Sequence, residues 1–122
     1  MIAEIPDHRI QAILRSRLES YMPLADEAKL VEAALQKPIG SRPLEEIAVG
    51  KEKVVLIASD HTRPVPCKLL EPPMLNAIRK GNPDAKITIL IATGCHRNTT
   101  KAELEEKFGP ELVAKEEIVV HD

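Results

Sequence analysis

The sequence predicts an α/β fold in which strands and helices alternate along the chain as right-handed βαβ units. Three short apolar runs rich in β-branched residues, about 54–59, 87–92 and 117–120, are typical of buried strands. Helical patterns lie between them. We therefore expect a three-layer, Rossmann-like arrangement around a mostly parallel sheet and, at 122 residues, a single domain.

The helices are predicted from apolar spacing and from capping residues. Residues 24–36 carry apolar side chains at helical spacing, and residues 100–108 open with a Thr-x-x-Glu capping box. Shorter helical turns are expected near 44–47 and 111–115.

Two stretches are harder to assign. Pro72 and Pro73 are acceptable in the first turn of a helix, so the helix between the first two strands is expected over about 71–80. Residues 1–22 fit either a helix, because their apolar side chains have helical spacing, or the remnant of a strand around 3–6.

Composition excludes several functional classes. A net charge of −2 and an aromatic content of 2% argue against a nucleic-acid surface and against an anionic membrane. No run approaches the ~20 apolar residues of a membrane span, and we expect no signal peptide. Cys67 and Cys95 lie far apart and form no CxxC pair, which fits a reducing compartment. We therefore expect a cytoplasmic protein.

Polar side chains follow each of the predicted strands. Asp60, His61 and Arg63 follow the first strand, His96 follows the second, and His121 follows the third. The carboxyl ends of parallel strands meet at one edge of a sheet, and open α/β sheets bind their ligands there. We expect a functional cleft at this edge; the alternative is that these residues are only caps and loop contacts.

Three kinds of side chain in these loops suggest specific chemistry. Arg63 offers a planar fork for a carboxylate or phosphate, or for an ion pair with its neighbouring acid. His96 follows Gly94, where the backbone can approach a ligand closely, and an imidazole suits general acid–base work near neutral pH. Thr99 and Thr100 precede a helix N-terminus, a natural anion site, although capping alone would explain both residues.

The remaining groups support more than one interpretation. Asp60 can orient an imidazole, bind a ligand hydroxyl or cap a turn. His61 faces the cleft only if the alternating side chains of Asp60 and Thr62 do not. The cysteines are more often small buried thiols. A zinc site would match none of the standard short motifs and would draw on His61, Cys95, His96 and His121.

Two longer motifs together resemble the nickel-dependent lactate racemase family. Residues 60–66 spell Asp-His-Thr-Arg-Pro-Val-Pro, and residues 92–100 spell Ala-Thr-Gly-Cys-His-Arg-Asn-Thr-Thr. The similarity extends over most of residues 24–122. It implies that residues 1–122 are the N-terminal α/β domain of a larger two-domain isomerase, whose C-terminal domain is absent from this chain.

The family resemblance also implies a reaction and a cofactor. Family members racemise or epimerise a 2-hydroxy acid, typically lactate. A histidine removes the hydroxyl proton, and the α-hydrogen is transferred reversibly as hydride to a pyridinium ring. That ring belongs to a nickel-pincer nucleotide, pyridinium-3-thioamide-5-thiocarboxylic acid mononucleotide carrying nickel. The expected partners are the small-molecule substrate and the missing domain, with no nucleic acid and no membrane.

By motif position, His96 matches one of the two acid/base histidines of the family. Asp60 and Arg63 match its functional acid and arginine, so Arg63 is expected to anchor substrate or cofactor and Asp60 to support by hydrogen bonding. The second histidine, the tethering lysine and the nickel-binding histidine lie further along in the family. We therefore expect no metal ligand in this chain and no activity from it alone. The residues expected to shape the rim beside the cofactor are Thr93, Gly94, Thr99 and Thr100.

Two alternative functions stay open. The first is a racemase or epimerase of another 2-hydroxy acid, such as malate or a sugar acid. The second is a non-catalytic phosphate- or nucleotide-binding module built on the helix start at Thr99 and Thr100.

Overall fold

A sheet of three parallel strands forms the centre of the computed structural model, which describes residues 4–22 and 26–122. Its strands are β1 (Lys53–Ser59), β2 (Lys86–Ala92) and β3 (Glu117–Val120), paired in that order. All three predicted strands are confirmed, and the first two begin one residue before the predicted start.

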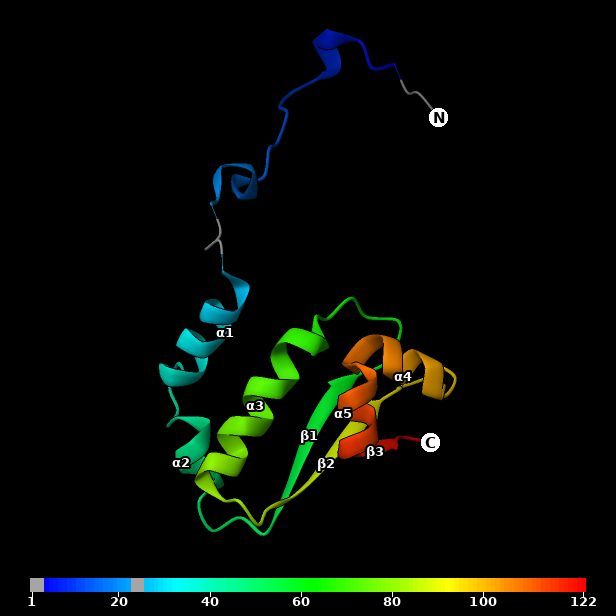
Figure 1. Cartoon of the computed structure of the whole chain (residues 1–122). Coiled ribbons are helices and arrows are strands. Elements are labelled where there is room, and N and C mark those ends of the chain that lie inside the picture. Colours follow the sequence, from blue (N-terminus) through cyan, green and yellow to red (C-terminus); the bar gives the residue numbers. More distant parts are fainter. Residues whose placement is uncertain (1–3, 23–25) are drawn as a thin grey trace.

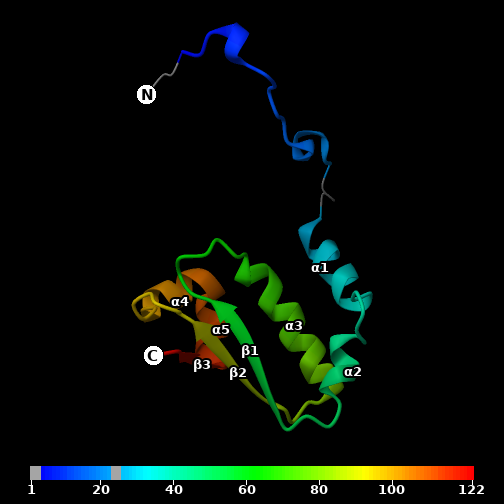
Figure 2. The same cartoon turned by 180° about the vertical axis from the view of Figure 1, so that it is seen from behind.

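The helices that connect the strands lie on one face of this sheet (Figures 1 and 2). Helix α3 (Cys67–Gly81) links β1 to β2, while α4 (Lys101–Phe108) and α5 (Pro110–Lys115) link β2 to β3. Both connections use the same face because consecutive crossovers share one hand and the strand order does not reverse. Helices α1 (Glu27–Gln36) and α2 (Leu44–Ala48) pack beside α3.

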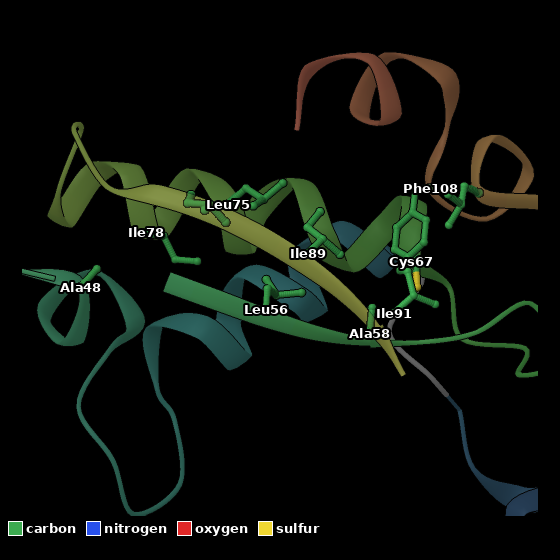
Figure 3. Packing of buried hydrophobic residues seen from close by; sticks show 11 residues of the cluster. Ala48, Leu56, Ala58, Cys67, Leu75, Ile78, Ile89, Ile91 and Phe108 are labelled. Atoms are coloured by element: carbon green, nitrogen blue, oxygen red, sulfur yellow. The ribbon is translucent and has the colours of Figure 1, made fainter. Parts of the chain in front are cut away.

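The hydrophobic core lies between the sheet and these helices (Figure 3). Ile89 and Ile91 of the central strand are fully buried, and Leu75 and Ile78 of α3 pack against the same layer. Phe108, the one phenylalanine of the chain, closes the core at the end of α4. Burying a large aliphatic side chain contributes about 1.5–3 kcal/mol, so aliphatic packing can hold this fold with few aromatic residues.

Helix α3 is longer than the sequence predicts. It begins at Cys67 instead of residue 71 and continues through both Pro72 and Pro73. An interior proline removes a backbone hydrogen bond and costs about 3 kcal/mol. The helix persists because one of its faces is packed into the core, and a tertiary contact of this kind overrides local propensity. That buried stripe consists of Cys67, Glu71, Leu75 and Ile78.

Residues 4–22 form neither the predicted helix nor a strand. They contain two short 3-10 helices, Asp7–Arg9 and Arg17–Ser20, and every one of these residues is exposed. Apolar periodicity does not produce a helix here, because an isolated helix of this length is marginal without a surface to pack on. Residues 1–3, and residues 24 and 25 of the first predicted helix, lie outside the described residues.

The second face of the sheet is left open by the described part of the chain. Ile57 and Val55 of β1 point to this face and are 71% and 60% exposed. The α/β class and the parallel βαβ units are confirmed. Of the three layers expected, residues 4–22 and 26–122 form two: the sheet, and helices on one of its faces.

No helix within the described ranges is both long enough and apolar enough to cross a membrane.

Candidate functional site

A cleft of about 530 Å³ lies beyond the carboxyl ends of β1 and β2. One wall comes from the loop that follows β1 and the other from the loop that follows β2. These loops meet because the strands that lead into them are parallel neighbours. Five of the predicted site residues line the cleft together: Asp60, Arg63, Thr93, Gly94 and His96.

The centre of the cleft is a carboxylate–imidazole pair. Oδ2 of Asp60 lies 2.5 Å from Nδ1 of His96, across 36 positions of sequence. The Asp60 side chain is 2% exposed, whereas that of His96 is 45% exposed. An ionised carboxylate can only accept, so Nδ1 donates and the lone pair of the neutral ring lies on Nε2. Asp60 therefore fixes the orientation of the His96 ring and leaves Nε2 free to act as a base.

Thr62 holds Asp60 in place and keeps it ionised. The Thr62 hydroxyl donates to Oδ1 of Asp60 at 2.7 Å, and the Thr62 backbone N–H donates to the same oxygen at 3.1 Å. The Thr62 hydroxyl is the largest cause that lowers the pKa of Asp60 to about 2; burial opposes it, and the bond to His96 adds to it. No role was predicted for Thr62 from the sequence, although an Asp two positions before a Thr is a familiar turn signal.

Arg63 lies on the boundary between this cleft and a second cavity of about 520 Å³ on the helix side of the rim. Its backbone carbonyl accepts a hydrogen bond of 2.8 Å from Nζ of Lys107 on α4, which ties the loop to that helix. No ion pair joins its guanidinium to Asp60 or to another acid in the described ranges. The fork of Arg63 is therefore available to an anionic ligand.

Thr93 and Gly94 shape the second loop. The buried hydroxyl of Thr93 donates to the backbone carbonyl of His121 at 2.8 Å, which joins this loop to the end of β3. Gly94 has φ +61°, a left-handed conformation that glycine adopts without strain. A Cβ built at Gly94 would meet no atom of the described residues within 4 Å, so the backbone angle, not crowding, is what requires glycine here.

Thr99 and Thr100 do not line the cleft, and both make hydrogen bonds within the chain. The Thr99 hydroxyl lies 3.1 Å from Nδ1 of His61. Thr100 is the N-cap of α4 and forms the predicted capping box with Glu103. Glu103 also accepts bonds of 2.9 and 2.6 Å from the Arg97 guanidinium, and Arg97 is the main cause of its lowered pKa. A carboxylate of the protein itself thus occupies the start of this helix.

The other candidate ligands are not brought together. His61 lines the second cavity, where its Nε2 lies 3.9 Å from Oε1 of Glu103, whereas the neighbouring Asp60 lines the cleft. Cys67 is buried, Cys95 is exposed, and both thiols are free. Within the ranges that the structure describes, no group of three or more His, Cys, Asp or Glu could hold a metal ion.

Beneath the rim, a buried acid belongs to the stripe of α3 that packs into the core. Glu71 is 5% exposed, and its Oε2 has no hydrogen-bond partner among the residues that the structure describes. Burial raises the pKa of Glu71, while the thiol of Cys67 and the charge of Lys107 lower it. Burial likewise raises the pKa of the Cys67 thiol. The sequence did not indicate that Glu71 is buried, because the helix was predicted to begin at that residue and not at Cys67.

Replacing Glu71 with Gln is expected to stabilise the chain at pH 7. A carboxyl whose pKa is raised by folding contributes most below its unfolded pKa and loses that contribution as the pH rises through the folded pKa. The free energy of unfolding of Glu71→Gln should therefore exceed that of the parent by an amount that grows as the pH rises above the unfolded pKa of a glutamate, as urea titrations would measure. Glu106→Gln, at an exposed position of α4, is the matched control. A parent as stable as Glu71→Gln at pH 8 would contradict this expectation.

Comparisons with a family model, with curated proteins and with solved structures all point to the same family. The family model for the lactate racemase N-terminal domain matches residues 1–122. Over 119 residues the chain is 50% identical to the lactate racemase of Thermoanaerobacterium thermosaccharolyticum and 46% identical to that of Lactiplantibacillus plantarum. Each match covers 98% of this chain and 28% of the relative.

A solved structure shows the same fold. The lactate racemase apoprotein from Thermoanaerobacterium thermosaccharolyticum matches with a TM-score of 0.85 and 48% identity, over 98% of this chain and 27% of that chain. The chain thus spans less than a third of the length of the relatives that it matches.

Proposed function

The chain belongs to the lactate racemase family, whose N-terminal domain it matches, and we propose that it forms one wall of the active site of a lactate racemase. The observation that carries this proposal is the pair of Asp60 and His96, 2.5 Å apart in a cleft that Arg63 also lines. Such a cleft offers a base and a cation, the two groups needed to engage the hydroxyl and the carboxylate of a 2-hydroxy acid.

His96 is proposed to remove the hydroxyl proton of the substrate. With Nδ1 bonded to Asp60, the free lone pair on Nε2 is the acceptor. Asp60 keeps the ring oriented, and its negative charge stabilises the imidazolium that forms, as the buried carboxylate does in serine hydrolases. Because its pKa is about 2, Asp60 supplies that charge throughout the neutral range.

Arg63 is proposed to anchor the substrate carboxylate. Its planar fork can donate two parallel hydrogen bonds, which fixes the direction of the bound acid as well as its position. Lys107 holds the backbone of Arg63 from α4, so the loop that carries this cation is tied to the helical layer. Thr93 and Gly94 are proposed to shape the rim at which the cofactor would sit.

The described residues do not form a metal site, so we propose that the nickel-pincer nucleotide is held by a second domain of a longer enzyme. When bound, this group would accept the α-hydrogen as hydride and return it to either face of the carbon. The second acid/base histidine is proposed to lie in the same missing part. The chain alone is therefore expected to be inactive. Its two free thiols fit the proposed cytoplasmic location.

The competing functions differ in how well they fit the site. A racemase of malate or a sugar acid would use this wall equally well, because it engages only the hydroxyl and carboxylate that all 2-hydroxy acids share. A phosphate-binding module at the start of α4 is less well supported, because Glu103 already occupies that helix terminus with its own carboxylate.

A chimera tests the proposed function. Residues 1–122 would replace the matching segment of the Thermoanaerobacterium thermosaccharolyticum enzyme, to which they are 50% identical, and conversion of L-lactate to D-lactate would be followed with the cofactor supplied. We expect racemisation, and we expect His96→Ala to slow it by roughly 10²–10⁴-fold, the range for loss of a general base. His8→Ala, at an exposed histidine far outside the cleft, is the matched control. A folded chimera that does not racemise lactate, or one that keeps its rate after His96→Ala, would contradict the proposal.

A further inference from the structure

The two loops of the rim are joined twice, by neighbouring residues of the first loop. Asp60 binds His96 in the cleft, with Oδ2 and Nδ1 2.5 Å apart. The next residue, His61, lines the second cavity instead, and its Nδ1 lies 3.1 Å from the hydroxyl of Thr99. Thr99 follows His96 by three positions, so both contacts hold the same loop. We call the contact between His61 and Thr99 the rim clamp.

The rim clamp is shielded from water and connected to α4. Thr99 is 6% exposed, and the side chain of His61 is 16% exposed. Nε2 of His61 lies 3.9 Å from Oε1 of Glu103. The guanidinium of Arg97 and the backbone N–H of Thr100 both donate to that carboxylate. Without the ring, the buried Thr99 hydroxyl would have no hydrogen-bond partner among the described residues, which would disfavour the present position of the loop.

The second loop depends on side-chain contacts because it has little backbone support. Residues 94–99 belong to neither a helix nor a strand. The backbone N–H of His96 donates to the carbonyl of Thr93 at 3.0 Å. In the part of the chain that the structure describes, residues 97–99 make no hydrogen bond from backbone to backbone. The position of the loop is therefore set by side chains, at His96 itself and again at Thr99.

The surroundings of the rim clamp assign its hydrogens. The Thr99 hydroxyl has Nδ1 of His61 as its one hydrogen-bond partner among the described residues, so it donates to that nitrogen. The nearby carboxylate of Glu103 favours a hydrogen on Nε2 of the same ring. A neutral His61 therefore carries its hydrogen on Nε2, which is the reverse of His96.

We propose that His61 is a positioning residue of the racemase. By accepting a hydrogen bond from Thr99, it fixes the second loop from the helix side and so keeps the ring of His96 against Asp60. His61 does not line the cleft, so it acts through the loop and not on the substrate. A displacement of a catalytic group by about 1 Å can cost about 10²-fold in rate. This inference rests on the proposed function, in which His96 is the base.

The ¹⁵N spectra of the 122-residue chain test the rim clamp without relying on activity. At a pH where both rings are neutral, we expect the hydrogen on Nε2 of His61 and on Nδ1 of His96. Thr99→Val keeps the shape and removes the hydroxyl, so the two ¹⁵N signals of His96 should shift toward one another as its bond to Asp60 is populated less. Thr99→Ser should leave them unchanged. Thr88→Val is the matched control, because it removes another hydroxyl hydrogen bond, 2.7 Å long, near the start of β2.

Kinetics of the chimera test the link to racemisation. Asn and Leu side chains have nearly the same shape, but only Asn offers an acceptor in the place of Nδ1. We expect His61→Leu to lower kcat for L-lactate roughly 10- to 100-fold. KM should change little, because the proposed carboxylate anchor, Arg63, stays in place. His61→Asn should recover most of the rate.

Unchanged His96 signals in folded Thr99→Val would overturn the inference, and so would equal rates for His61→Leu and His61→Asn. If Thr99→Val does not fold, the same spectra of His61→Leu decide, because His61 is less buried than Thr99. A chimera that is inactive before any substitution would contradict the proposed function, and the spectra would still decide on the rim clamp. An active chimera whose rate and His96 signals are unchanged by His61→Leu would support the proposed function and contradict the rim clamp.

Discussion

Replacing Asp60 with Asn in the chimeric racemase is expected to lower the racemisation rate by roughly 10²–10⁴-fold while the protein stays folded. Oδ1 of Asp60 accepts both bonds from Thr62, so the carbonyl of an Asn would keep that position. Its NH₂ group would then take the place of Oδ2 and donate to Nδ1 of His96. The ring would have to carry its hydrogen on Nε2, and the base would be lost.

The effect of Asp60→Asn should appear in kcat and not in folding. Initial rates with L-lactate, together with thermal melts of each variant, separate the two. Asp84→Asn, an exposed carboxylate in the turn before β2, provides the matched control and should leave the rate unchanged. Parental activity in folded Asp60→Asn would show that the carboxylate does not orient the base.

Replacing Arg63 with Ala is expected to reduce kcat/KM for lactate by roughly 10- to 100-fold, the loss expected when a hydrogen bond to a charged group is removed. Arg63→Lys should recover only part of this loss, because an ammonium group cannot form the two parallel bonds of the guanidinium fork. The side chain makes no ion pair with the described acids, so neither change should unfold the chain.

The control for Arg63 is Arg42→Ala, at an exposed position between α1 and α2. Saturation curves with lactate for the three variants distinguish weaker substrate binding from slower chemistry. If Arg63→Lys matched the parent, a simple positive charge would be sufficient, and the proposed two-bond anchor would be wrong.

Most of the fold could be predicted from local pattern. The strands were recognisable because continuous apolar runs have few alternatives, and α4 because its capping box is encoded by Thr100 and Glu103. The start of α3 could not be predicted, because packing of Cys67 and Glu71 into the core overrides two prolines. The bare face of the sheet was also unforeseen, since the apolar runs alone imply that both faces are covered.

The candidate site was predictable in outline from one topological rule. Parallel strands bring their carboxyl ends together, so loops carrying Asp60 and His96 had to lie near each other. Which side chains pair could not be read from sequence, because the alternation between Asp60 and His61 was undecided until the loop path was known. Two positioning residues were not predicted, because their contacts depend on the path of the loop after β1. Thr62 fixes Asp60, and Lys107 of α4 donates to the backbone carbonyl of Arg63.

The ¹⁵N spectrum of the His96 ring in the 122-residue chain tests the central claim most directly, because it reports which nitrogen carries the hydrogen. At a pH where the ring is neutral, we predict a protonated Nδ1 and an unprotonated Nε2, with the two reversed in Asp60→Asn. A neutral His96 ring that carries its hydrogen on Nε2 in the parent chain would contradict the claim that Asp60 holds it as a base toward the cleft.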